Sequence, residues 1–174
     1  MTVLQPIREK LRRAQGAFFR AADAIPVDKW GDCPGVNEWS AAQLVAHLVV
    51  VERGIVTRVD QLTQNSPIPI PFLKRIHLPL WLVEARVIRR KSPVPLDESL
   101  LAEKEPMLAG LRGVRERTMA FIEETERRDL SGYCWRHPFL GMLNVYEWMG
   151  MIAAHQLRHT KQVREIEAKL SRKL

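Results

Sequence analysis

Apolar residues recur at steps of three and four along most of this chain, and this helical period constrains the fold more than any other feature. Two-residue alternation never persists long enough to indicate a strand. The apolar stripes run through residues 4–22, 44–62, 108–125 and 148–170. Four long amphipathic helices of this kind bury their stripes against one another, so the sequence predicts an all-α fold, a four-helix bundle.

Local signals predict where these helices begin. Ser40 followed by Gln43 is a capping-box pattern at the start of the second helix. Asn144 is the expected N-cap of the fourth helix, with Glu147 three residues later. The third helix is expected to begin at Pro106, because proline suits the first helical position.

A proline-rich insertion separates the second and third helices. Residues 65–95 hold six of the eleven prolines, and each proline removes an amide donor and clashes with the preceding turn. We therefore expect a long crossover here, with a short helix within residues 80–91. Phe72 and Trp81 give this crossover a lid-like character.

Length and composition limit the class of protein. A chain of 174 residues with 46% hydrophobic and 27% charged residues fits one globular domain, which we place at residues 1–174. No apolar run approaches the length of about 18 residues that a membrane span needs. Charges interrupt the first residues, where a signal peptide would need its apolar segment. Cys33 and Cys134 are too few for a disulfide framework, so a cytoplasmic location is expected.

The net charge of +7 does not by itself indicate a nucleic-acid partner. Residues 74–91 carry six basic groups and one acidic group, whereas residues 97–129 carry six basic and nine acidic groups. A nucleic-acid-binding protein would show a basic face with interleaved aromatic residues, or a recognisable binding motif. Neither pattern is present, so we expect a solvated exterior that attracts anionic substrates weakly.

Three histidines on apolar stripes are the candidate functional residues. His155 and His159 lie four residues apart on the fourth helix, and therefore on one face of it. His47 lies on the apolar stripe of the second helix. Buried imidazoles need polar partners, and a divalent metal ion satisfies them while leaving positions open for water or substrate. The alternative is that these are hydrogen-bonded core histidines.

Other candidate groups are weaker. His77 in the crossover and His137 before the fourth helix are expected to be exposed. Gln156 stands where the metalloprotease motif HExxH needs its glutamate, which excludes that class. Glu52 and Glu147 are not assigned as a general base. The chain also has no glycine-rich phosphate loop, GxSxG motif or CxxC motif.

Two segments resemble the DinB/YfiT-like superfamily of metal-dependent enzymes. NEWSAAQLVAHLVVVE, residues 37–52, resembles the tryptophan–serine helix start that precedes a histidine in this family. HPFLGMLNVYEWMGMIAAHQLRHTKQVREI, residues 137–166, is similar to its terminal block, in which a His-x-x-x-His pair is followed by glutamine. The resemblance implies an up-down-down-up four-helix bundle, frequent dimers, and a metal, commonly nickel or zinc, held by His47, His155 and His159.

The resemblance also implies classes of reaction. Characterised members of the family include S-transferases that use bacillithiol or mycothiol, a maleylpyruvate isomerase and metal-dependent hydrolases. Our first hypothesis is a metal-dependent enzyme that uses a low-molecular-weight thiol against a small-molecule electrophile. The second is a metal-dependent hydrolase, and the third is a non-catalytic dimeric binding or stress-response module. The sequence does not choose between the first two, because both need the same three ligands.

Overall fold

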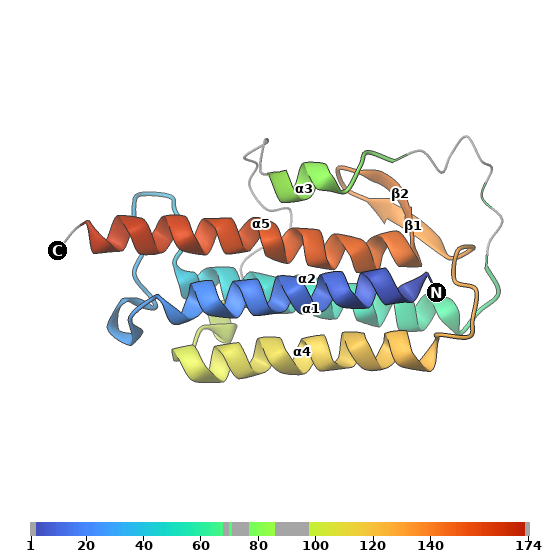
Figure 1. Cartoon of the computed structure of the whole chain (residues 1–174), viewed down its shortest axis with the longest axis horizontal. Helices are drawn as coiled ribbons and strands as arrows, with labels where there is room; N and C mark the ends of the chain where they lie inside the picture. The colour runs from blue at the N-terminus through green and yellow to red at the C-terminus, as the bar shows by residue number, and fades with distance from the viewer. Residues whose placement is uncertain (1–2, 68–69, 71–76, 86–97, 173–174) are drawn as a thin grey trace.

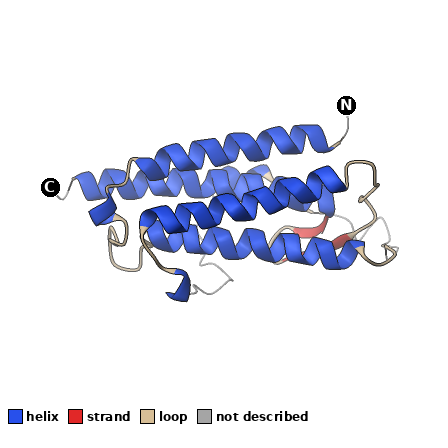
Figure 2. Ribbon diagram, turned by 90° about the horizontal axis from the view of Figure 1, so that it is seen from below, coloured by secondary structure: helices blue, strands red, loops and turns tan. Residues whose placement is uncertain are grey.

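Four long helices lie side by side in the computed structural model of the chain (Figures 1 and 2), which describes residues 3–67, 70, 77–85 and 98–172. They are α1 (Leu4–Asp23), α2 (Ala41–Thr63), α4 (Lys104–Glu124) and α5 (Val145–Ser171). The colour gradient in Figure 1 shows that α2 and α4 run in one direction and α1 and α5 in the other. The mainly helical fold class predicted from the periodicity is confirmed.

The apolar stripes of these helices form the core. Helix α1 packs chiefly against α5, and α2 packs chiefly against α4. Fully buried side chains come from all four helices, among them Leu11, Phe18, Leu44, Val59, Leu108, Ile122, Ala153 and Val163. Helices α2 and α5 also contact each other, and this contact brings the candidate histidines together. Within the described ranges, no helix is both long and apolar enough to cross a lipid bilayer.

Two of the predicted helix starts are confirmed, and one is wrong by two residues. Ser40 and Gln43 form a reciprocal capping box at α2, and Asn144 forms one at the start of α5. Helix α4 begins at Lys104 rather than at Pro106. Proline fits inside the first turn because the amides of that turn have no partner within the helix.

A β-hairpin before α5 was not expected from the sequence. Strands β1 (Cys134–His137) and β2 (Gly141–Asn144) pair antiparallel, with Cys134 opposite Asn144. Each strand has only four residues, too few for an alternating pattern to be recognised. Gly141, whose φ of 102° favours glycine, is the local signal that marks the turn. The hairpin appears in red in Figure 2.

Three short helices complete the described structure. The 3₁₀ helix η1 (Val27–Lys29) follows α1, helix α3 (Trp81–Ala85) lies in the proline-rich insertion, and the 3₁₀ helix η3 (Glu98–Leu100) precedes α4. Helix α3 falls inside the expected range of 80–91, of which residues 86–91 lie outside the described residues.

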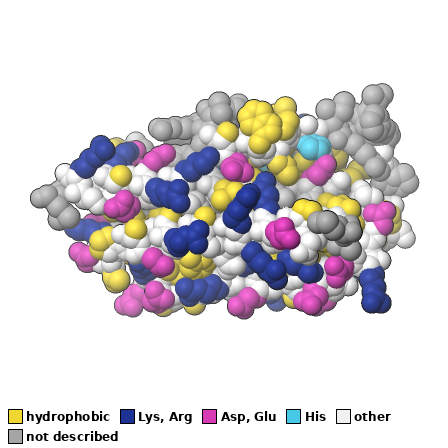
Figure 3. All heavy atoms as spheres, in the orientation of Figure 1, with side chains coloured by type: hydrophobic (Ala, Val, Ile, Leu, Met, Phe, Trp, Pro, Cys, Tyr) yellow, Lys and Arg dark blue, Asp and Glu magenta, His cyan; other side chains and the backbone are white. Residues whose placement is uncertain are grey.

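Helix α3 packs along α5 (Figure 1). Arg158 Nη1 donates to the carbonyl of Val83 at 3.2 Å, and Lys161 Nζ donates to the carbonyl of Glu84 at 2.8 Å. Trp81, one of the two aromatic residues expected to give the crossover its lid-like character, is 61% exposed. The other, Phe72, lies outside the described residues. Figure 3 shows hydrophobic side chains gathered on the surface over α3.

Candidate metal centre

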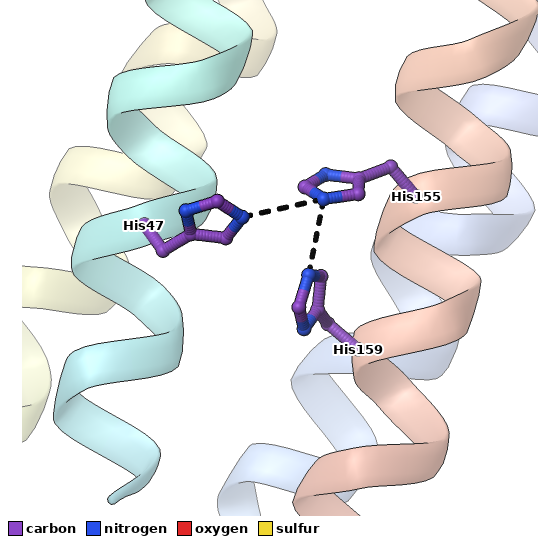
Figure 4. Close-up of side chains that lie close together, drawn as sticks. All are labelled: His47, His155 and His159. Atoms are coloured by element: carbon purple, nitrogen blue, oxygen red, sulfur yellow. Dashed lines mark hydrogen bonds between the residues drawn. The ribbon is translucent and has the colours of Figure 1, made fainter. Parts of the chain in front are cut away.

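The structure brings His47, His155 and His159 together between α2 and α5 (Figure 4). The Nε2 atom of His155 lies 3.3 Å from Nε2 of His47 and 3.1 Å from Nε2 of His159. His47 and His159 are buried, whereas His155 keeps partial exposure. We call these three residues the histidine cluster.

Helix geometry explains the arrangement. His155 and His159 are one turn apart, so their rings project from the same face of α5. His47 projects toward them from α2, about two turns after Ser40, the N-cap of that helix. The ring of Trp39, just before the N-cap, packs against the ring of His47 with centroids 5.2 Å apart.

The outer nitrogens of the cluster differ in their partners. Nδ1 of His159 lies 3.0 Å from the side-chain oxygen Oε1 of Gln162. An amide oxygen can only accept, so Nδ1 of His159 carries the proton and its Nε2 presents a lone pair to the cluster. Nδ1 of His47 is buried, and no described residue provides it with a hydrogen-bond partner.

The surroundings favour the neutral form of His47 and His155. Burial lowers the pKa of His47 to about 4. The pKa of His155 lies well below its ordinary value because of burial first, and then because of the positive charges that His159, His47 and Arg158 can place near it. A neutral imidazole is the form that binds a metal ion, so the pKa shifts favour ligation.

The nitrogen positions fit a divalent metal ion. Imidazole nitrogens bind zinc at about 2.0–2.1 Å, so two ligands at tetrahedral angles lie about 3.3 Å apart. The Nε2 separations of 3.1 and 3.3 Å match this edge length, and all three ligand atoms lie within 4.8 Å of one another. Three nitrogen donors suit zinc and nickel, and also copper and iron.

Sequence comparison places this site in a family. The sequence profile of the DinB superfamily matches residues 10–163, a span that contains all three histidines. The chain belongs to the DinB superfamily. It is 27% identical over 147 residues to "Uncharacterized protein YuaE" of Bacillus subtilis (strain 168), an alignment that covers 83% of this chain and 87% of that protein. No solved structure is significantly similar to the chain.

The two remaining histidines of this DinB-superfamily protein lie outside the cluster, and both are half-buried rather than exposed as expected. His77 Nε2 pairs with the Glu147 carboxylate at 2.7 Å. The second oxygen of Glu147 accepts from the Asn144 amide in the capping box. The pair therefore connects the proline-rich insertion to the first turn of α5.

His137 lies in the turn end of the hairpin. Its Nδ1 accepts from the amides of Phe139 and Leu140, both at 3.1 Å, which places the ring proton on Nε2. Its ring lies 5.1 Å from that of Trp148, which in turn stacks on Trp135. Burial lowers the pKa of His137 to about 4.

Two residues beside the cluster were given no role from the sequence, although one of them, Gln162, is the glutamine that follows the histidine pair in the family resemblance. Gln162 orients His159, and its position three residues later on the same helix was a usable signal. Arg158 places a positive charge near His155. It looked like one more basic residue of a helix exterior, because its contact with α3 is invisible in the local sequence. Glu52 is buried in an ion pair with Arg115 and is therefore not available as a base.

Proposed function

We propose that this protein is a divalent-metal-dependent enzyme in which His47, His155 and His159 hold zinc or nickel. The observation that carries the proposal is the convergence of three ring nitrogens within 4.8 Å of one another. Nε2 of His155 lies 3.3 and 3.1 Å from those of His47 and His159, and the site disfavours the charged form of His47 and His155. Like charges or paired donors at this distance would repel, whereas a cation between the lone pairs satisfies all three. We further propose that α1, α2, α4 and α5 are the up-down-down-up bundle of the family.

The reaction we propose is transfer of a low-molecular-weight thiol to a small-molecule electrophile. A bound divalent ion would supply Lewis acidity that favours the thiolate over the thiol near neutral pH. Three neutral ligands leave the full charge of such an ion uncompensated, and Arg158 adds a further positive charge near His155. Both features favour an anionic sulfur over a neutral one.

The protein's own side chains orient the centre. Gln162 holds the tautomer and ring plane of His159, and the Trp39 ring limits the position of His47. In the reaction, the sulfur forms a bond to the electrophilic carbon, the leaving group departs with its bonding electrons, and the thiol proton passes to solvent.

Metal content is the first test. The protein is purified without a histidine tag, and its metal content is measured by mass spectrometry beside that of His47→Ala/His155→Ala/His159→Ala. We expect roughly one divalent ion per chain in the wild type, loss of that ion in the triple variant, and retention in His77→Gln, a control that alters a histidine outside the cluster. Absence of metal after incubation with zinc and nickel would contradict the proposal and favour a binding module.

Activity is the second test. Metal-loaded protein is mixed with chlorodinitrobenzene and either bacillithiol, mycothiol or cysteine, and formation of the thioether is followed by absorbance. We expect turnover that requires both metal and thiol and that is lost in His155→Ala. Hydrolysis of esters or phosphoesters without thiol would contradict the transferase and support the metal-dependent hydrolase, which would use the same three ligands.

A further inference from the structure

A second polar cluster lies in the core, centred on Arg115 of α4. Arg115 is 2% exposed. Its Nε and Nη2 donate to the two carboxylate oxygens of Glu52 on α2, at 2.7 and 2.9 Å. Nη2 also donates to Oε1 of Gln156 on α5 at 2.9 Å, and Nη1 donates to the carbonyl of Leu11 on α1 at 2.7 Å. One side chain therefore contacts all three of the other long helices.

The buried polar side-chain atoms around Arg115 all have hydrogen-bond partners. Thr118, three residues after Arg115 on α4, donates a hydrogen bond from its hydroxyl to Oε1 of Glu52 at 2.7 Å. No buried side-chain nitrogen or oxygen of these described residues lacks a partner. We call Glu52, Arg115, Thr118 and Gln156, with the carbonyl of Leu11, the Arg115 cluster.

The Arg115 cluster touches the two helices that carry the histidines, close to the histidines themselves. Glu52 follows His47 by five residues on α2, about 7–8 Å along the helix axis. Gln156 directly follows His155 on α5 and precedes His159 by three residues. The guanidinium thus bridges α2 and α5 within about two turns of the converging nitrogens.

Stability alone does not explain this arrangement. Burying two charges costs desolvation free energy, and well-packed apolar residues of similar volume often stabilise a core as much or more. A planar guanidinium that donates from all three nitrogens instead sets both the distance and the direction of the groups it binds, because its N–H groups point in fixed directions. Supporting contacts of this kind determine how accurately ligands are held at a metal site.

We propose that Arg115 is a positioning residue for the histidine cluster: through Glu52 and Gln156 it holds α2 and α5 at the separation that metal binding requires. This inference rests on the metal site proposed above. It predicts that cutting the Arg115–Gln156 contact weakens metal binding in protein that is still folded.

The main variant is Gln156→Leu, which removes the contact to α5 and leaves the Glu52–Arg115 ion pair in place. The control is Lys104→Met. Lys104 is also a buried cation of α4, but the carbonyls that accept its hydrogen bonds belong to Asp23 and Ile25, outside α2 and α5. Zinc dissociation constants are measured by competition with a chromophoric chelator, and unfolding free energies by urea denaturation of the metal-free proteins.

We expect Gln156→Leu to weaken zinc binding about 10-fold or more and Lys104→Met to leave it unchanged, although both lose stability. Arg115→Lys, which keeps the charge but not the planar fork, is the second variant and should also weaken zinc binding. Unchanged zinc affinity in both folded variants would overturn the positioning role while leaving the metal site intact. A wild type that binds no zinc or nickel would overturn both proposals together.

Discussion

The histidine cluster and the Arg115 cluster are both polar groups in an apolar core, but they differ in how their atoms are satisfied. In the Arg115 cluster every buried donor and acceptor side-chain atom has a partner within the chain. In the histidine cluster three nitrogens face one another, and Nδ1 of His47 is buried without a partner among the described residues.

Buried polar atoms normally find a partner, and an exception needs an explanation. A complete network acts on the protein itself, by fixing how its helices pack. In the histidine cluster the Nε2 atoms point at one another, and a metal ion placed among them can accept their lone pairs. This difference is why we assign the ligand site to the histidines and the positioning role to Arg115.

The largest effect should come from breaking the complete cluster. Arg115→Met leaves the Glu52 carboxylate buried without its partner, so we expect a loss of about 3–5 kcal/mol in unfolding free energy. Arg115→Met combined with Glu52→Leu should recover part of this loss, because no unpaired charge then remains in the core. Urea denaturation monitored by circular dichroism measures both. A double variant no more stable than the single one would contradict the ion-pair explanation.

Zinc binding to the histidine cluster should produce the next largest change in unfolding free energy. Zinc at about 100 times its dissociation constant should raise the unfolding free energy by about 2.7 kcal/mol, since the ion binds only the folded chain. The variant His47→Ala/His155→Ala/His159→Ala should show no such increase when zinc is compared with a chelator in thermal and urea unfolding. An equal increase in that variant would show that zinc binds elsewhere.

The two clusters also differ in how much of each could be predicted from the sequence. His155 and His159 could be predicted because they lie four residues apart on the apolar stripe of one helix. His47 could be predicted because it lies on the apolar stripe of another helix. The capping boxes at Ser40 and Asn144 were found for the same reason: their partners lie three residues away.

The Arg115 cluster could not be predicted in this way. Arg115 lies 63 residues from Glu52 and 104 from Leu11, and a charged residue in the middle of an amphipathic helix normally faces solvent. The hairpin of residues 134–144 was missed for a related reason, because its four-residue strands depend on packing beside α5 rather than on a pattern of their own.

The stability of the protein should depend on pH through His137, the half-buried histidine of the hairpin. Burial lowers the pKa of His137 from 6.5 to about 4, so as the pH falls the unfolded chain takes up this proton before the folded one. The stability that His137 contributes is complete above pH 6.5 and is lost between pH 6.5 and about 4.

His137→Asn tests this effect, because the amide oxygen of asparagine can accept from Phe139 and Leu140 as Nδ1 does. We expect the unfolding free energy of His137→Asn to fall less steeply over this pH range than that of the wild type, with chelator present throughout. Parallel curves for the two proteins would show that His137 is not responsible.

The smallest expected change in unfolding free energy distinguishes the two clusters most directly. His47→Leu replaces a buried imidazole whose Nδ1 lacks a partner among the described residues by an apolar side chain of similar volume. In chelator we therefore expect the unfolding free energy to stay equal or rise by up to about 1 kcal/mol. Thr118→Val, a change of the same kind in the satisfied cluster, should lower it by about 1–2 kcal/mol, because Glu52 loses a hydrogen bond. A loss of unfolding free energy in Thr118→Val without a loss in His47→Leu, measured by urea denaturation, would support the distinction between a ligand site and a structural network. A loss in His47→Leu as large as in Thr118→Val would mean that the metal-free histidines already stabilise one another, and the argument from unsatisfied nitrogens would fail.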